Sequence, residues 1–144
     1  MFLSLATLAK YGFNKRRLTE SDFYEICERR GIAVQELDVG ASFYIYVLGM
    51  ETIVIDKKLK AIAREFAMFH ELSHALLGIR TNGPQALFIG MCDTREEDEA
   101  DAFAAIALIP LTRIEDRSFM DECCCGVAQK VYEKRLYLYQ TYGV

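Results

Sequence analysis

The chain has 144 residues, of which 52% are apolar and 26% are charged, and its formal net charge is −4. This balance is typical of a globular protein, and we expect a single domain over residues 1–144 with its own hydrophobic core. The acidic balance argues against nucleic-acid binding driven by overall charge. No stretch has the ~18 consecutive apolar residues of a membrane span, so no membrane association is expected.

The amino-terminal segment, MFLSLATLAKYGF, resembles a secretory signal. A signal places its positive charge before the apolar region, whereas Lys15, Arg16 and Arg17 follow it here. That order predicts an amphipathic first helix instead. The cysteines agree with a reducing compartment, because three of the five are adjacent and cannot all pair: Cys27, Cys92, Cys123, Cys124 and Cys125. We therefore expect a cytoplasmic protein without disulfides.

The next elements are a second helix and a group of strands. Thr19 is a candidate N-cap, and Gly31 stands where that helix would end. Aromatic and β-branched residues then predict strands between Ile32 and Asp56, including a hairpin with strands at 42–48 and 52–55 and a turn at 49–51. A further short strand is predicted at 86–89.

Two longer helices follow. The first is predicted from about Leu59 to Leu77, and the second from Thr94 to just before Pro110. A helical pair at about 118–142, broken near Gly126, closes the chain. Helices grouped around a small sheet predict an α+β fold.

The first of these long helices carries the sequence His70-Glu71-Leu72-Ser73-His74, which holds the only two histidines. Positions i and i+4 lie on one face of a helix, so both imidazoles can bind one metal ion. Glu71 lies ~100° round the helix, close enough to activate a water on that metal. Ala63, Ala67 and Ser73 flank the histidines, and we expect an open face there.

A catalytic zinc site has three protein ligands and a fourth position for water, so the third ligand here is a carboxylate or a cysteine. On the following helix Glu97 and Asp101 share one face, whereas Glu99 lies on another. Glu97 is therefore the predicted ligand, and Asp101 is predicted to accept a proton from an imidazole Nδ1. Glu96 stays an alternative ligand, because helix rotation cannot be read from sequence. Acidic first turns also occur simply to complement the helix dipole.

Residues 66–78, followed by 97–105 and 107–110, resemble the ImmA/IrrE family of bacterial and phage metallopeptidases, a branch of the zincins. The shared signature is HELxH, then ExEAxxFA, then a Leu-Pro pair, which departs here to Leu108-Ile109-Pro110. Looser similarity spans residues 20–142. The resemblance implies a zincin-like fold, in which a small β-sheet packs against the HExxH helix and a second metal-ligand helix, with a carboxy-terminal helical pair.

The resemblance also implies a zinc-dependent endopeptidase, with the metal on His70, His74 and Glu97 and with Glu71 as general base. Its partner would be a helix-turn-helix repressor, cleaved to control genes of a mobile element or a stress response. Zinc is the expected ion, although Mn²⁺ and Fe²⁺ accept the same donors. The resemblance implies less strongly that Asp101 accepts the proton of a ligand imidazole.

Three further hypotheses stand beside this one. The chain could be a non-catalytic metal-binding regulatory module that binds a partner, its site buried against its own carboxy-terminal helices or sealed by Cys92 as a fourth ligand, although Glu71 would then have no use. The terminal helices could bind DNA, but their cations are too few for the phosphate contacts that DNA binding needs: Lys130, Lys134 and Arg135. We expect these helices to pack onto the core or a partner instead. The strand at 43–48 could hold an extended peptide by edge pairing.

Overall fold

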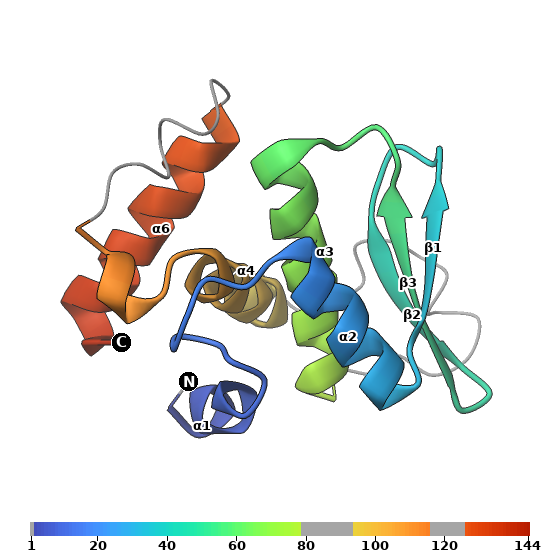
Figure 1. Cartoon of the computed structure of the whole chain (residues 1–144), viewed down its shortest axis with the longest axis horizontal. Helices are drawn as coiled ribbons and strands as arrows, with labels where there is room; N and C mark the ends of the chain where they lie inside the picture. The colour runs from blue at the N-terminus through green and yellow to red at the C-terminus, as the bar shows by residue number, and fades with distance from the viewer. Residues whose placement is uncertain (1, 79–93, 116–125) are drawn as a thin grey trace.

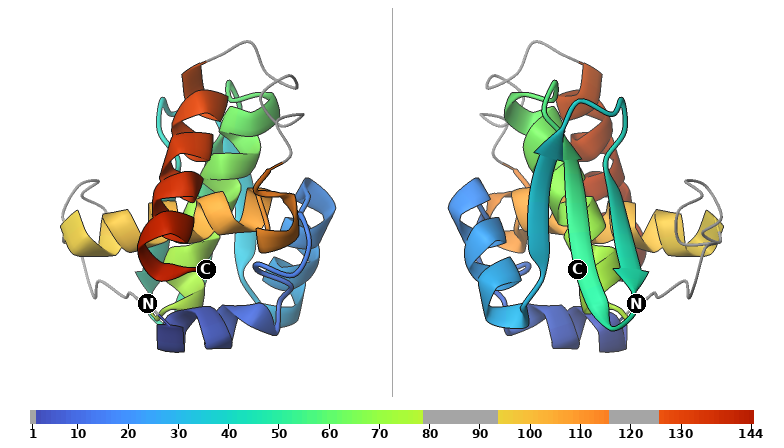
Figure 2. Two further views of the ribbon diagram at one scale, coloured as in Figure 1. Left: turned by 90° about the vertical axis from the view of Figure 1, so that its left-hand side faces the viewer. Right: turned by 90° about the vertical axis from the view of Figure 1, so that its right-hand side faces the viewer.

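The computed structural model of the chain describes residues 2–78, 94–115 and 126–144, and it has an α+β architecture, as predicted. A three-stranded sheet lies on one side, α2 and α3 pack against it, and α4 and α6 lie farther out (Figure 1). No described helix covers the opposite face of the sheet (Figure 2). The elements in chain order are α1 (Phe2–Ala9), α2 (Glu20–Arg30), β1 (Ala33–Leu37), β2 (Phe43–Val47), β3 (Met50–Asp56), α3 (Ala61–Leu76), α4 (Thr94–Leu108), the short 3₁₀ helix η2 (Leu111–Arg113) and α6 (Gly126–Tyr142).

Helix α2 begins and ends at the predicted residues. Thr19 is its N-cap, and the backbone N–H and hydroxyl of Thr19 both donate to the Asp22 carboxylate, at 2.8 and 3.0 Å. Gly31 ends the helix with a φ of 69°, a left-handed conformation that glycine adopts without a steric penalty. The capping residues thus determine this helix locally.

The sheet has the strand order β1-β3-β2, with β1 parallel and β2 antiparallel to β3. The register pairs Val47 with Met50, so the hairpin loop consists of Leu48 and Gly49 alone. Both loop residues have positive φ, 52° and 77°, as a two-residue type I′ turn requires. The turn predicted at 49–51 is therefore wrong, because pairing with Val47 extends β3 back to Met50.

Helices α3 and α4 lie within two residues of their predicted bounds at each end. They form the most extensive contact between any two described elements. Small residues favour this close approach, since five alanines of α4 are buried: Ala100, Ala102, Ala104, Ala105 and Ala107. The crossing places the first turns of α4 beside the middle of α3.

Helix α6 packs on α4 through buried residues that include Val131 and Leu138. Gly126, the predicted break in the terminal pair, is the first residue of this helix. The predicted partner helix from 118 and the predicted strand at 86–89 lie outside the described residues. None of the described helices is long and apolar enough to span a membrane.

Arg135 of α6 is fully buried and joins the residues after its own helix to two segments earlier in the chain. Its guanidinium donates to the carbonyl of Ile109 at 2.6 Å, to the carbonyl of Val144 at 2.6 Å and to the Asn14 side chain at 3.0 Å. Burial lowers the pKa of Arg135 to about 10, which leaves it charged at neutral pH. Arg135 is therefore part of the core and not of a cationic surface.

Candidate metal centre

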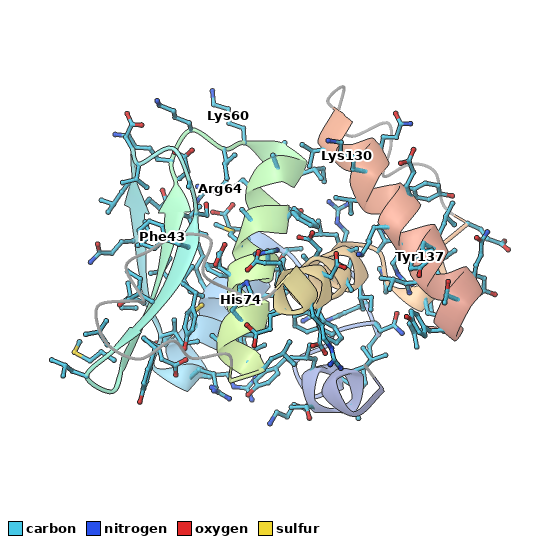
Figure 3. The ribbon with its side chains drawn as sticks, turned by 180° about the vertical axis from the view of Figure 1, so that it is seen from behind. Phe43, Lys60, Arg64, His74, Lys130 and Tyr137 are labelled. Carbon is cyan, nitrogen blue, oxygen red and sulfur yellow. The ribbon has the colours of Figure 1, made fainter. Side chains whose placement is uncertain are left out.

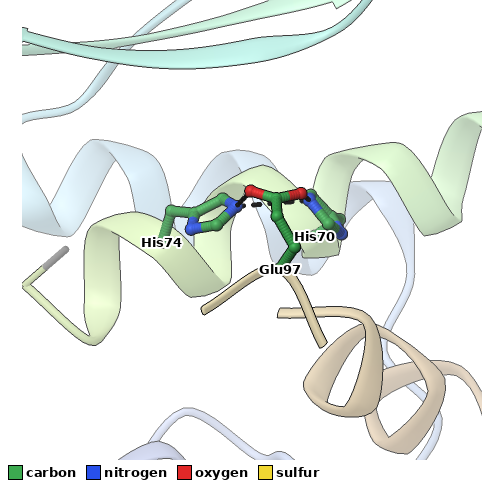
Figure 4. A group of neighbouring side chains, drawn as sticks. All are labelled: His70, His74 and Glu97. Carbon is green, nitrogen blue, oxygen red and sulfur yellow. Dashed lines mark hydrogen bonds and ion pairs between the residues drawn. The ribbon is translucent and has the colours of Figure 1, made fainter. Parts of the chain in front are cut away.

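Helix α3 presents both imidazoles on one side (Figure 4), and Figure 3 shows His74 where α4 crosses this helix. The Nε2 atoms of His70 and His74 are 3.2 Å apart, and the ring centroids are 4.9 Å apart. This proximity follows from the four-residue spacing, which places the second imidazole one turn along the same face. The histidines are therefore arranged as two donors to a common point.

Helix α4 supplies the third donor. Glu97 lies between the imidazoles, with Oε2 3.1 Å from His70 Nε2 and Oε1 3.0 Å from His74 Nε2 (Figure 4). These three side chains form a group that could hold a metal ion. Glu96, the alternative ligand, does not belong to any such group among the described residues. Cys92 lies outside the described residues.

The donor spacing fits a zinc ion. Nitrogen and oxygen ligands at ~2.0–2.1 Å from a tetrahedral zinc are about 3.3 Å from one another. The two Nε2 atoms are 3.2 Å apart, close to this value, and each is 3.0–3.1 Å from a different oxygen of the Glu97 carboxylate, so one ligand atom from each residue lies within 4.8 Å of the others. Two imidazoles and one carboxylate are also a known ligand set of catalytic zinc sites.

Asp101, one turn after Glu97, approaches His70 from the other side of the ring. Its Oδ1 lies 2.7 Å from His70 Nδ1. A carboxylate only accepts hydrogen bonds, so Nδ1 carries the proton, and with a metal bound Nε2 would offer its lone pair to the ion. This is the contact that the shared face of Glu97 and Asp101 predicted.

The two histidines have opposite pKa shifts. Burial alone would lower the pKa of His70, but the hydrogen bond to Asp101 and the charges of Glu71 and Glu97 outweigh it and raise that pKa. Burial, together with the charge of His70, lowers the pKa of His74. His74 Nδ1 is buried without a hydrogen-bond partner among the described residues. The lowered pKa favours the neutral imidazole of His74, which is the form that binds a metal.

Glu71 lies beside the donor group and is not one of its three members. Its side chain is buried, and Oε1 is 4.0 Å from His70 Nε2. Burial raises the pKa of Glu71 to about 8, against the opposing effect of His70 and of a hydrogen bond from the Tyr44 backbone N–H. The Tyr44 contact has no sequence signal, because it depends on how β2 packs on α3.

The surroundings differ in part from the expected open face. Ala63 and Ala67 are half-buried, but Ser73 is fully buried and donates to the Phe69 carbonyl at 2.7 Å. Ser73 thus faces the core, and the side of α3 next to it is packed and not open. Phe66 borders the site instead, with its ring centroid 6.2 Å from that of His70.

Comparison with known proteins adds a family. A family model described as the IrrE N-terminal-like domain, Peptidase M78, matches residues 27–121, which is 95 of the 144 residues. The matched range contains His70, Glu71, His74, Glu97 and Asp101. No curated protein and no solved structure shows significant similarity to the chain.

Proposed function

The chain belongs to the IrrE N-terminal-like domain family of M78 peptidases, and on this premise we propose that it is a zinc-dependent endopeptidase with a zincin-like fold. The observation that carries the proposal is the convergence of His70, His74 and Glu97, whose ligand atoms all lie within 4.8 Å of one another. A bound zinc ion would supply a water of lowered pKa and a Lewis acid for the scissile carbonyl. Mn²⁺ and Fe²⁺ are the competing ions for the same donors.

In the proposed reaction Glu71 is the general base. It accepts a proton from the attacking water and delivers it to the leaving amine. Its burial and its position 4.0 Å from a ligand nitrogen support this role. Burial raises the pKa of Glu71 to about 8 without a metal, and the positive charge of a bound zinc ion would lower it again and favour the carboxylate that a general base needs.

Asp101 is proposed as a positioning residue. By accepting the Nδ1 proton of His70 it keeps the imidazole in one tautomer and one orientation, which is the usual role of a carboxylate behind a ligand histidine. The Tyr44 N–H acts comparably on Glu71, since it holds the carboxylate at the side of β2.

The proposed substrate is a protein, specifically a helix-turn-helix repressor whose cleavage would alter expression of a mobile element or a stress response. The resemblance to the ImmA/IrrE family is what supports it. Pairing of an extended substrate segment with β2 stays a hypothesis, supported by the contact between Tyr44 and Glu71. Direct DNA contact by α6 is not favoured, because Arg135 is buried and Lys134 lies 3.5 Å from Asp98.

The test compares the wild type with Glu71→Gln, using Glu65→Gln on the same helix as the matched control. Each protein is loaded with zinc and incubated with the helix-turn-helix protein encoded next to it. We expect elemental analysis to give equal metal content in all three proteins. Mass spectrometry of the partner should detect cleavage by the wild type and the control only. Tight binding of that partner without cleavage by any of the three would instead support the non-catalytic regulatory module.

A further inference from the structure

Positive charge is concentrated at one place on this acidic protein. The 21 residues from Lys10 to Arg30 contain six of the 17 lysines and arginines of the chain but only four of its 21 acidic residues. They form the connection between α1 and α2 together with α2 itself (Figure 1). This segment lies on elements other than α3 and α4, which carry the metal centre.

A cleft of about 260 Å³ lies between this connection and α2. Four cations and two carboxylates line it, so the lining has a net charge of +2: Lys10, Lys15, Arg16, Arg29, Asp22 and Glu25. One carboxylate is already neutralised, since Arg16 binds Asp22 through hydrogen bonds of 2.6 and 2.9 Å. Over the ranges that the structure describes, no carboxylate is within ion-pair distance of the other three cations.

Tyr11 lines this cleft, and cationic side chains lie around its ring. Lys10 Nζ is 5.1 Å and Arg29 Cζ is 5.9 Å from the ring centroid, and Arg30 donates to the phenol oxygen at 3.3 Å. Burial alone would raise the pKa of Tyr11, but the adjacent Arg30 and Lys10 outweigh it and lower that pKa. The cleft therefore has a positive potential that favours an anion.

The helix dipole at the carboxy-terminal end of α2 explains only part of this positive charge. Arg29 and Arg30 lie in the last turn, where cations complement the helix dipole. The helix dipole places only about half a negative charge at that end, which offsets a small part of the charge of the two arginines. Lys10 and Lys15 of the connecting segment add two further positive charges. An excess of positive charge is left for a ligand.

We propose that this cleft binds a phosphoryl group, either as inorganic phosphate or as the monoester of a small organic molecule. Such a group carries a charge of about −1.5 to −2 at neutral pH, which complements the +2 of the lining. Double-stranded nucleic acid is a poorer match, because it is bound through a long row of phosphate contacts and not through one small cleft. The proposal is independent of the peptidase function.

The test is an amide proton–nitrogen NMR titration of the full chain with inorganic phosphate and, separately, with phosphoserine, at constant ionic strength. We expect saturable shifts confined to residues 9–16 and 22–30, with half-saturation at about 1 mM, as expected for a few exposed charge pairs. Equal affinities for the two probes would assign binding to the phosphoryl group alone. Tighter binding of phosphoserine would add a contribution from the organic part, and both results support the proposal.

Charge-matched variants provide the control. Lys10→Gln with Arg29→Gln is expected to weaken binding about tenfold, whereas Lys57→Gln with Lys130→Gln, which removes two exposed cations elsewhere, leaves it unchanged. Lys15→Gln alone is the substitute if the first pair lowers the melting temperature. Shifts that grow linearly to about 20 mM phosphate, or equal weakening of binding in the two double variants, would overturn the proposal. Either result would show that phosphate interacts only with the diffuse positive charge of the surface. Displacement of phosphate by a short DNA duplex at micromolar concentration would overturn it in favour of a nucleic-acid surface.

Discussion

His70 Nδ1 and Asp101 Oδ1 are 2.7 Å apart, although the two residues are separated by 31 positions in the chain. This contact crosses from α3 to α4 and determines which nitrogen of the imidazole carries the proton. It leaves Nε2 directed at Glu97, which is 3.1 Å away. The donor geometry at the candidate centre thus depends on a residue that is not itself a ligand.

Replacing Asp101 tests that dependence. Asp101→Asn removes the charge and allows the amide to present either a donor or an acceptor to Nδ1, so the imidazole is no longer held in one tautomer. We expect zinc affinity to fall about 10- to 100-fold, measured by competition with a chromophoric chelator. Asp98→Asn, an exposed position on the same helix, is the control and should keep the wild-type affinity. Equal losses in the two variants would attribute the effect to general charge.

Glu97 and Glu96 are distinguished by metal content. Glu97→Ala removes a donor 3.0 Å from His74 Nε2 and is expected to leave less than stoichiometric zinc after dialysis, by elemental analysis. Glu96→Ala is expected to retain one equivalent, because Glu96 is not in the donor group. Zinc should also raise the melting temperature of Glu96→Ala but not of Glu97→Ala, since a ligand stabilises only the state that binds it. The reverse pattern would make Glu96 the ligand.

The capping box of α2 predicts a pH-dependent stability. The Arg16 guanidinium, aided by Thr19, lowers the pKa of Asp22 from 3.8 to about 2. A carboxyl with a lowered pKa stabilises the fold above its unfolded value, and this contribution is lost as the pH falls from about 4 to about 2.

Asp22→Asn should therefore lower the free energy of unfolding by about 1–2 kcal/mol at pH 7, with the difference shrinking toward pH 2. Urea denaturation at several pH values measures it. Glu25→Gln, exposed on the same helix, is the control and should change little at any pH. A deficit for Asp22→Asn that persists at pH 2 would show that the charge is not its cause.

The hairpin turn predicts a stabilising substitution. Leu48 is 96% exposed and has a φ of 52°, so it makes little contact yet adopts a conformation that is costly for a branched side chain. Leu48→Asn creates the Asn-Gly pair favoured in type I′ turns and should raise the free energy of unfolding by about 0.5–1 kcal/mol. Leu48→Ala is the control, because it removes the same exposed surface without the turn preference. Equal gains in both would contradict the turn explanation.

Much of the architecture could be predicted because its signals are local. The bounds of α2 follow from Thr19 and Gly31, and those of α3 and α4 follow from their periodicity and from Pro110. The predicted hairpin turn differs from the observed one because the register depends on pairing with the partner strand, and local propensity carries no information on that pairing. Arg135 shows the same limit, since its burial against Ile109, Val144 and Asn14 depends on the packing of segments far apart in the chain.

At the candidate metal centre the sequence alone determined that His70 and His74 share a face, because a four-residue spacing on a helix leaves no other geometry. It also placed Glu97 and Asp101 on one face of a second helix. Only the tertiary structure decided that this face meets the histidines, that Glu97 and not Glu96 lies between them, and that Asp101 reaches His70. The rotation of one helix against another depends on the side chains packed between them, which the sequence of either helix alone does not determine.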